Sequence, residues 1–373
     1  MIRNIRASEG SSIYLLGICA GSLLSMFMSL ALSKVTAGFG GMAVQSWVGY
    51  VLMQIAFIAC VLIYARVRRF DEMYIARIRK PLNLWQLVLT PFIAIATILA
   101  FLPLANAWTS FLGIIGYHGA GVSMPYFNNV GVYFVSLLVM AVLPAFGEEL
   151  LMRGNVFRGL SSRSAWFGIL MSALFFSLMH ANPVQTVHQF GIGITLALTL
   201  ILTNSLWACV LVHFFNNFIS ITLTAYLPQV NAIYFSLGYY NWLVGAASTV
   251  VGIVLLIILF YVMYIMGEKG RDGVVRSSFN GGPANAPVCG VLQYDDFTLF
   301  TLSQKPTKSN PVKDFFRFFK SLFTRAGWRN LTRALRMRSG DEYVGKAQNM
   351  IGVWLALGLV IVYWLYSFIV GMI

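Results

Sequence analysis

The sequence predicts an all-α fold, a polytopic bundle of transmembrane helices with about nine spans. Three observations predict it. Hydrophobic residues make up 58% of the 373 residues and charged residues only 10%, whereas soluble domains carry about 45–50% apolar and about 25% charged residues. The chain contains nine apolar runs close to the roughly 20 residues that cross a bilayer. Nearly all lysines and arginines fall between alternate runs, so that they share one side of the predicted bundle.

The nine runs supply the predicted elements in order. They lie near residues 12 to 34, 46 to 65, 83 to 106, 130 to 152, 164 to 182, 184 to 204, 205 to 227, 240 to 266 and 350 to 372. The first run lacks a small-residue cleavage site and eight runs follow it, so we interpret it as a membrane anchor that stays in the protein. The first eight runs form a core, and the ninth is a separate C-terminal helix.

Positive charge sets the orientation of the bundle, because cytoplasmic loops accumulate Lys and Arg. With the N-terminus in the cytoplasm, every Lys and Arg except Lys34 falls on the inner side. Nine spans then place the C-terminus outside. This topology and an anionic inner leaflet explain the net charge of +14, and no nucleic-acid motif accompanies it. We expect an integral protein of a bacterial plasma membrane.

The chain divides into three parts. Residues 1–266 form the transmembrane bundle, residues 267–348 form a basic cytoplasmic segment, and residues 349–373 form the C-terminal transmembrane helix. Within the basic segment, Phe recurs at helical spacing among Lys and Arg at about 313–338. This pattern is typical of an amphipathic helix on the anionic inner leaflet. The alternative is a solvated helix that packs on its own protein.

Ionisable side chains inside the predicted spans are few, and they are clustered. A charged side chain in hydrocarbon costs about 2.5 kcal/mol or more, so it is retained mainly where it is paired or has a function. In the spans up to residue 266 these side chains are Glu148, Glu149, Arg153, His180, His188 and His213. The cluster therefore indicates a polar site within the membrane.

The fourth span carries two adjacent carboxylates followed by an arginine, in the run EELLMR. Because successive helical residues are about 100° apart, Glu149 and Arg153 share one face and can neutralise each other. Glu148 points to another face without that partner. We predict that Glu149 is structural and that Glu148 is available for chemistry. The alternative is that both carboxylates pair with inner-side arginines and only stabilise a helix end.

Two later spans carry the imidazoles. Phe176 and His180 share a helix face, although a lone His in an apolar helix is more often a satisfied core residue than a catalyst. His213 and Asn217 also share a face, and such donors can stabilise the oxyanion of a tetrahedral intermediate by about 3 kcal/mol each. The alternative for this pair is a hydrogen bond between helices, worth about 0.6 kcal/mol on average. Asn216 is turned away and is the less suitable donor.

Together these side chains supply a general base, a group that orients water, and two oxyanion donors, as hydrolysis of an amide by water requires. Their heights in the membrane differ, however. Along straight helices with a rise of ~1.5 Å per residue, His180 lies about 27 Å and His213 about 13 Å above the inner side. We therefore expect the sixth and seventh spans to tilt, break or enter shallowly, with Gly191 and Gly193 in the sixth span as places for such a change.

The runs EELLMRG, FSLMH and HFFNN resemble the three-part signature of the CAAX-protease and bacteriocin-processing family of intramembrane endopeptidases, also called the Abi family. The three parts of that signature are EExxxR, FxxxH and HxxxN, in this order. The resemblance covers Val142 to about Phe218 and does not extend to the N-terminal spans or the tail. The long inner loop and ninth helix after residue 267 depart from the compact pattern that the resemblance implies.

The resemblance implies a peptidase core at about 130–227 and a role for each matching residue. It implies that Glu148 activates water with help from His180, and that His213 and Asn217 hold the oxyanion. The supporting residues are Glu149, Arg153 and Phe176.

We expect an endopeptidase that cleaves a membrane-associated protein or peptide with activated water and without a metal. One alternative is a zinc-dependent version in which Glu148, His180 and His213 form a His2Glu site, although the HExxH motif is missing and the four scattered cysteines form no metal cage. A second alternative is a non-catalytic membrane protein for immunity, secretion or transport. A transporter is expected to show inverted repeats, which we do not find in the sequence. The sequence does not identify the substrate.

Overall fold

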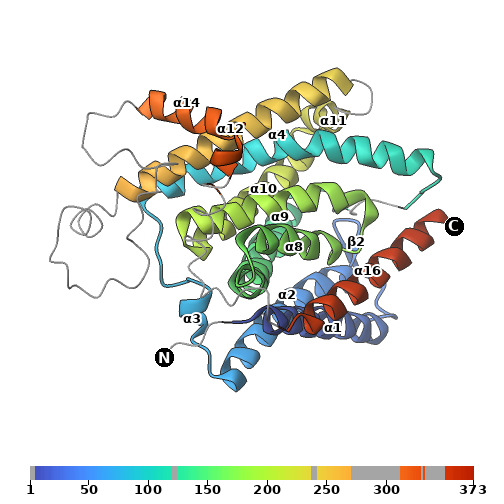
Figure 1. Ribbon diagram of the computed structural model, residues 1–373. Helices are drawn as coiled ribbons and strands as arrows, with labels where there is room; N and C mark the ends of the chain where they lie inside the picture. The colour runs from blue at the N-terminus through green and yellow to red at the C-terminus, as the bar shows by residue number, and fades with distance from the viewer. Residues whose placement is uncertain (1–4, 120–123, 237–241, 270–310, 329–330, 332–348) are drawn as a thin grey trace.

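A computed structural model of the chain describes residues 5–119, 124–236, 242–269, 311–328, 331 and 349–373. This part of the chain is a bundle of helices with one short hairpin, which confirms the predicted all-α fold (Figure 1). The α-helices are α1 (Ala7–Ala31), α2 (Val44–Arg68), α3 (Glu72–Ile75), α4 (Leu84–Ile114), α5 (Val130–Leu137), α6 (Leu143–Glu149), α7 (Phe157–Ser161), α8 (Ala165–Leu178), α9 (Thr186–Thr203), α10 (Leu206–Tyr226), α11 (Pro228–Ser236), α12 (Trp242–Lys269), α14 (Pro311–Ser321) and α16 (Ile351–Met372).

The fifth predicted span is shorter than a membrane crossing. Within the described residues, eight helices are long and apolar enough to span a membrane, and α8 is not one of them. Its 14 residues cover only about 21 Å of the ~30 Å hydrocarbon layer. The turn that follows α8 is tolerated because its polar backbone groups are bonded within the protein, as backbone at membrane depth requires. Trp108 Nε1, for example, donates to the Pro183 carbonyl at 2.8 Å.

The helices form three groups in Figure 1. The long helices α4 and α12 pack against each other along one side, and α1, α2 and α16 lie along the opposite side. Helices α8, α9 and α10 lie between these groups. A Cβ added to Gly252 of α12 would come within 2.3 Å of the Ala100 backbone in α4, so this glycine permits the close contact of the two long helices.

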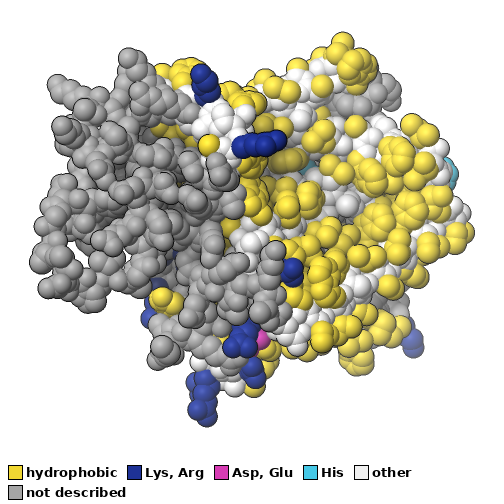
Figure 2. Space-filling view, in the orientation of Figure 1, with side chains coloured by type: hydrophobic (Ala, Val, Ile, Leu, Met, Phe, Trp, Pro, Cys, Tyr) yellow, Lys and Arg dark blue, Asp and Glu magenta, His cyan; other side chains and the backbone are white. Residues whose placement is uncertain are grey.

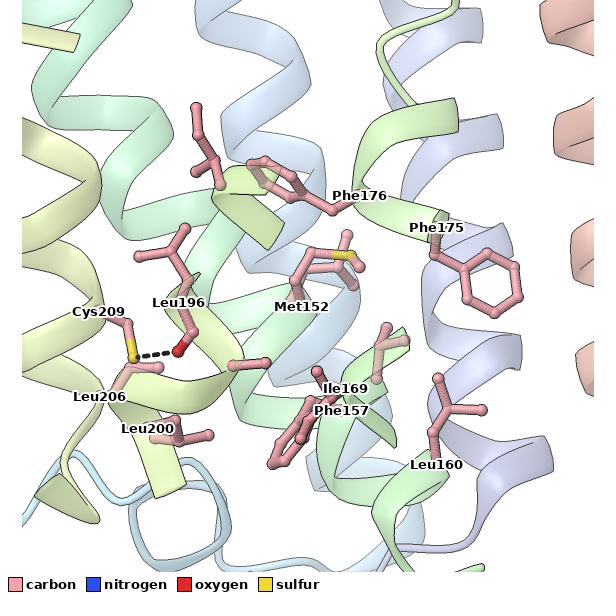
Figure 3. Close-up of a cluster of buried hydrophobic side chains, with 14 of the residues drawn as sticks. Met152, Phe157, Leu160, Ile169, Phe175, Phe176, Leu196, Leu200, Leu206 and Cys209 are labelled. Atoms are coloured by element: carbon pink, nitrogen blue, oxygen red, sulfur yellow. Dashed lines mark hydrogen bonds between the residues drawn. The ribbon is translucent and has the colours of Figure 1, made fainter. Parts of the chain in front are cut away.

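The central helices bury a large apolar core. Figure 3 shows side chains of this cluster, including Met152, Phe157 and Phe176, each no more than 1% exposed. The same view shows the Cys209 thiol donating to the Leu196 carbonyl at 3.4 Å. The core surrounds the segment that carries the two carboxylates and holds it among rigid helices.

Helix α9 is continuous from Thr186 to Thr203, so the prediction of a break at Gly191 or Gly193 is wrong. The two glycines serve close packing instead. A Cβ at Gly191 would lie 2.2 Å from the Phe101 ring, and one at Gly193 would lie 2.7 Å from Ala173 Cα of α8.

A small hairpin connects α1 and α2. Strands β1 (Gly38–Phe39) and β2 (Met42–Ala43) are antiparallel. Gly40 and Gly41 between them have φ of 59° and 72°, the left-handed values that a two-residue hairpin turn requires.

Helix α14 covers the first part of the amphipathic helix predicted at about 313–338. About half of the rest lies outside the described residues, as does most of 267–348. Tyr261 of α12 stacks on Phe318 and meets Phe315 edge to face. Phe316 is 63% exposed. One face of α14 therefore packs on its own protein, and another is free to meet a different surface.

Basic side chains lie mainly toward one end of the bundle. In Figure 2 most of the dark-blue Lys and Arg side chains lie in the left half of the view, and one lies at the lower right. Helix α16 ends at the right of the bundle, opposite the end from which α1 starts (Figure 1).

Candidate active site

The helix that carries the two carboxylates is interrupted by wider turns. Two π-helical segments, η1 (Leu138–Val142) and η2 (Leu150–Val156), flank α6 within the span from Val130 to Ser161. Such segments are rare and occur frequently at functional sites, because the wider turn redirects side chains and leaves carbonyls available. Glu148 and Glu149 are the last residues of α6, directly before η2.

Glu148 faces two other elements of the bundle. The residue is only 8% exposed. Its Oε1 accepts a hydrogen bond from Gln54 Nε2 of α2 at 3.0 Å. Its Oε2 lies 4.0 Å from His180 Nε2 and has no hydrogen-bond partner among the described residues. The structure thus brings together the predicted base and the first imidazole.

His180 lies in the turn after α8, and two contacts with Phe176 hold its ring. Nδ1 is 2.7 Å from the Phe176 carbonyl oxygen, and the two rings meet edge to face at 5.1 Å. The predicted contact between Phe176 and His180 is therefore confirmed. The next residue, Ala181, has a φ of 45°, a left-handed conformation that costs a residue with a Cβ about 1–2 kcal/mol. The surrounding hydrogen bonds hold this turn.

Glu149 joins a separate, fully buried cluster. Its Oε1 accepts from Arg153 Nη1 at 2.9 Å, which confirms the predicted pairing of these two residues. The same oxygen is 2.8 Å from His213 Nδ1 of α10, a contact that helical spacing did not predict. Arg153 Nη2 also donates to the Gly193 carbonyl of α9 at 3.2 Å. Glu149 and Arg153 therefore connect the carboxylate helix to α9 and α10.

The Phe176 ring contacts both imidazoles of the site and the Arg153 guanidinium. Besides its contact with His180, its ring meets His213 edge to face at 5.7 Å. The Arg153 guanidinium carbon lies 4.4 Å from the ring centroid, within the range of a cation–π interaction. Phe176 is fully buried, and Figure 3 shows its side chain among those of the apolar core.

Asn217 lies away from the carboxylates. Its Nδ2 donates to the Met140 carbonyl in η1 at 3.0 Å, and its Oδ1 accepts from Asn216 Nδ2 at 3.2 Å. Asn217 thus connects α10 to the carboxylate helix, and Asn216 contacts the Asn217 amide from within α10. The structure does not give Asn217 a hydrogen bond to His213 or Glu148.

The fit of a metal to the site depends on the grouping of its side chains. Within the described residues, no group of three His, Cys, Asp or Glu side chains lies close enough together to hold a metal ion. His213 Nδ1 faces Glu149 and His180 Nδ1 faces a carbonyl. The proposed set of Glu148, His180 and His213 therefore does not form a three-ligand site in this arrangement.

Gln54 was not predicted as a site residue, because its amide carries no charge and only ionisable side chains mark a polar site in an apolar span. The available signal was its polarity: Gln54 is the only Asn, Gln, Asp or Glu in the predicted span from 46 to 65. A buried polar side chain needs a partner, and in the structure that partner is Glu148.

Comparison with known proteins identifies one family. Residues 130–219 match the family model described as Type II CAAX prenyl endopeptidase Rce1-like. This segment contains all of the site described above except Gln54. Searches of curated proteins and of solved structures gave no match.

Proposed function

We propose that this chain hydrolyses a peptide bond with a water activated by Glu148 and His180. Through residues 130–219 the chain belongs to the Rce1-like family of type II CAAX prenyl endopeptidases. The family is one of proteases, and the long apolar helices make the chain an integral membrane protein. The reaction would therefore take place among transmembrane helices.

The separation of a buried carboxylate and a partly exposed imidazole carries this proposal. Glu148 Oε2 lies 4.0 Å from His180 Nε2, and no described residue hydrogen-bonds to this carboxylate oxygen. The distance is longer than a direct hydrogen bond of about 3 Å, yet one water can reach both atoms. A buried oxygen without a partner costs about 1–3 kcal/mol or more. A functional role explains why such a costly arrangement is kept.

The second ring nitrogen of His180 indicates how the water is held. A carbonyl oxygen only accepts hydrogen bonds, so we assign the proton to Nδ1, which faces the Phe176 carbonyl. Nε2 of the neutral ring then presents a lone pair. A water between Nε2 and Glu148 donates one proton to each, and its oxygen lone pairs are left to face the substrate.

The chemical step follows from this placement. The water oxygen attacks the carbonyl carbon of the peptide bond, and one water proton passes to Glu148 Oε2. When the C–N bond breaks, the leaving amine takes that proton and Glu148 is again ionised. The step needs no covalent intermediate with the protein.

His213 and Asn217 are the proposed oxyanion donors. In this role His213 would donate from Nε2 to the oxyanion, while its Nδ1 is held by Glu149 at 2.8 Å. Asn217 donates to the Met140 carbonyl at 3.0 Å. It must exchange this partner for the substrate before it can take part.

We propose that the reaction uses no metal, because the described His and Glu side chains lack a three-ligand grouping. Purified protein without bound metal should cleave its substrate in the presence of a chelator. Loss of activity on chelation that Zn²⁺ restores would instead support a zinc site with Glu148, His180 and His213 as ligands.

The proposed substrate is a membrane-associated protein or peptide, because the site lies among membrane-spanning helices. The description of the matching family names a CAAX prenyl endopeptidase. A farnesylated peptide that ends in a CAAX sequence is therefore the first probe for purified protein in vesicles.

Replacing Glu148 by Gln tests the proposed function. The change keeps the side-chain volume and an oxygen that can accept from Gln54, but it removes the base. Glu72→Gln is a matched control, because Glu72 is equally buried at 7% exposed and also accepts one amide hydrogen bond, from Asn155 at 2.9 Å.

The measurement is a mass-spectrometric comparison of membrane and secreted peptides from cells that carry each variant. We expect cleavage products to disappear in Glu148→Gln and to persist in Glu72→Gln. Unchanged products in Glu148→Gln would remove the enzymatic role of this site.

We also propose that the N-terminus is cytoplasmic and that α14 rests on the anionic inner leaflet. Its exposed Phe316 would enter the headgroup region, while Phe318 packs on Tyr261.

A fluorophore attached to the cysteine of Phe316→Cys, in a chain without other cysteines, tests the leaflet contact. It should be shielded from an aqueous quencher in anionic vesicles and less so in neutral ones. The same probe at Phe318→Cys serves as the control that stays shielded in both. Equal, full quenching at position 316 in both vesicles would contradict the leaflet contact.

A further inference from the structure

A buried amide from the second span contacts the proposed base. Gln54 is 4% exposed, and its Nε2 donates to Glu148 Oε1 at 3.0 Å. It lies on α2, outside the residues that match the family model. The N-terminal helices therefore supply a direct contact to the residue on which the proposed function depends.

The backbone around Glu148 is shaped to let this amide approach. A Cβ added to Gly147 would lie 2.6 Å from Gln54 Oε1 and 3.4 Å from the Gln54 carbonyl. A larger residue at position 147 would therefore displace the Gln54 amide from the position in which it contacts Glu148. The glycine next to Glu148 permits the separation at which the amide reaches the carboxylate.

The orientation of the amide follows from its partners. An ionised carboxylate only accepts, so the NH2 group of Gln54 must face Glu148. Gln54 Oε1 is then directed to Gly147 and has no hydrogen-bond partner among the described residues. A buried acceptor without a partner costs free energy. The hydrogen bond to Glu148 compensates for this cost, since hydrogen bonds to charged groups are worth about 1.5–3 kcal/mol.

The two oxygens of Glu148 are thereby divided between two tasks. Oε1 is occupied by Gln54, and Oε2 faces His180 Nε2 at 4.0 Å. We propose that Gln54 is a positioning residue: it fixes the carboxylate plane of Glu148 so that Oε2 is the oxygen that takes the proton from water. This inference rests on the proposed function and adds to it the element that orients the base.

The first test replaces Gln54 by Met, which has a similar volume and no donor. Partners that orient a reactive group commonly account for about 10- to 100-fold in activity. We expect kcat to fall by about that factor while KM stays the same, because Gln54 does not contact substrate. Gln86→Met is the matched control: Gln86 is also 4% exposed, and its side chain makes one cap hydrogen bond at the start of α4, away from Glu148.

The second test replaces Gln54 by Glu and uses the pH profile. Two carboxylates 3.0 Å apart cannot both stay ionised at low cost. The acidic limb of the pH–rate profile should therefore move to higher pH by about one unit or more, with activity recovering as the pH is raised. A residue whose side chain does not lie against the Glu148 carboxylate would not move this limb.

The outcomes separate this inference from the proposed function. Full kcat in Gln54→Met together with an unshifted profile in Gln54→Glu overturns the positioning role, while inactive Glu148→Gln still supports the peptidase. Active Glu148→Gln overturns the peptidase itself. If Gln54→Met does not fold, the profile of Gln54→Glu alone decides the inference.

Discussion

A buried acid outside the membrane spans makes the stability of the protein depend on pH. Glu72 lies in α3, between the spans α2 and α4, and is 7% exposed. Burial raises the pKa of its carboxyl group from 4.5 to about 7, the Asn155 hydrogen bond lowers it, and the charge of Asp71 raises it. Asn155 belongs to η2, so this acid connects the segment between α2 and α4 to the helix that carries Glu148.

The direction of the effect follows from proton binding. Between pH 4.5 and about 7 the folded state holds the Glu72 proton and the unfolded state has lost it. The free energy of unfolding therefore falls as the pH rises through this window, and the loss is complete above about pH 7. A shift of about 2.5 units at 1.36 kcal/mol per unit corresponds to about 3 kcal/mol across the window. Between about pH 5 and about pH 8 the expected change is about 2.5 kcal/mol.

Glu72→Gln tests this magnitude. Glutamine does not titrate in this range, and its carbonyl oxygen can still accept from Asn155. Reversible unfolding is measured in mixed detergent micelles and followed by circular dichroism. The free energy of unfolding of the variant, relative to that of the wild type, should rise by about 2.5 kcal/mol from about pH 5 to about pH 8. Asp71→Asn should narrow the window, because it removes a charge that raises the pKa of Glu72. Parallel pH profiles of the wild type and Glu72→Gln would refute the reasoning.

Two further predictions concern single contacts. Arg153→Met should lower the free energy of unfolding by about 3–5 kcal/mol, because it leaves the fully buried Glu149 without its cation. Arg79→Met is the control: it removes the ion pair between Asp71 and Arg79, whose side chain is 65% exposed. It should change the free energy of unfolding by less than about 1 kcal/mol. A loss for Arg153→Met as small as that of the control would contradict the structural role of the pair. Trp364→Phe removes the 2.8 Å hydrogen bond from α16 to Thr186. The free energy of unfolding, measured by the same assay, should fall by about 1 kcal/mol. An unchanged value would mean that α16 does not hold the turn before α9.

Helical periodicity predicted the contacts that lie within one helix. Residues four apart share a face, so Glu149 met Arg153 and Phe176 met His180 as expected. The same rule left Glu148 on a different face, where the structure has it. Apolar runs of sufficient length likewise predicted the long spans.

Contacts between helices were not predictable in this way, because periodicity gives the face of a residue and not the helix that the face meets. His213 therefore hydrogen-bonds to Glu149 and not to Glu148. Asn217 donates to a carbonyl of a π-helical segment that no sequence pattern predicted. The apolar run from 164 to 182 has the composition of a span. Its helix nevertheless ends at Leu178, because the following turn satisfies its backbone within the protein.

The most direct test of the central claim asks whether Glu148 and His180 act on one water as a unit. Glu148→Gln, His180→Gln and the double variant are compared by kcat on the same cleaved peptide, with His188→Gln as the control for loss of an imidazole nearby. Each single change should lower kcat by about 100-fold or more, and the double variant should be no slower than the slower single one, because groups that act together are not additive. A double variant slowed by the product of the two single losses, or a Glu148→Gln protein with the wild-type rate, would contradict the shared water.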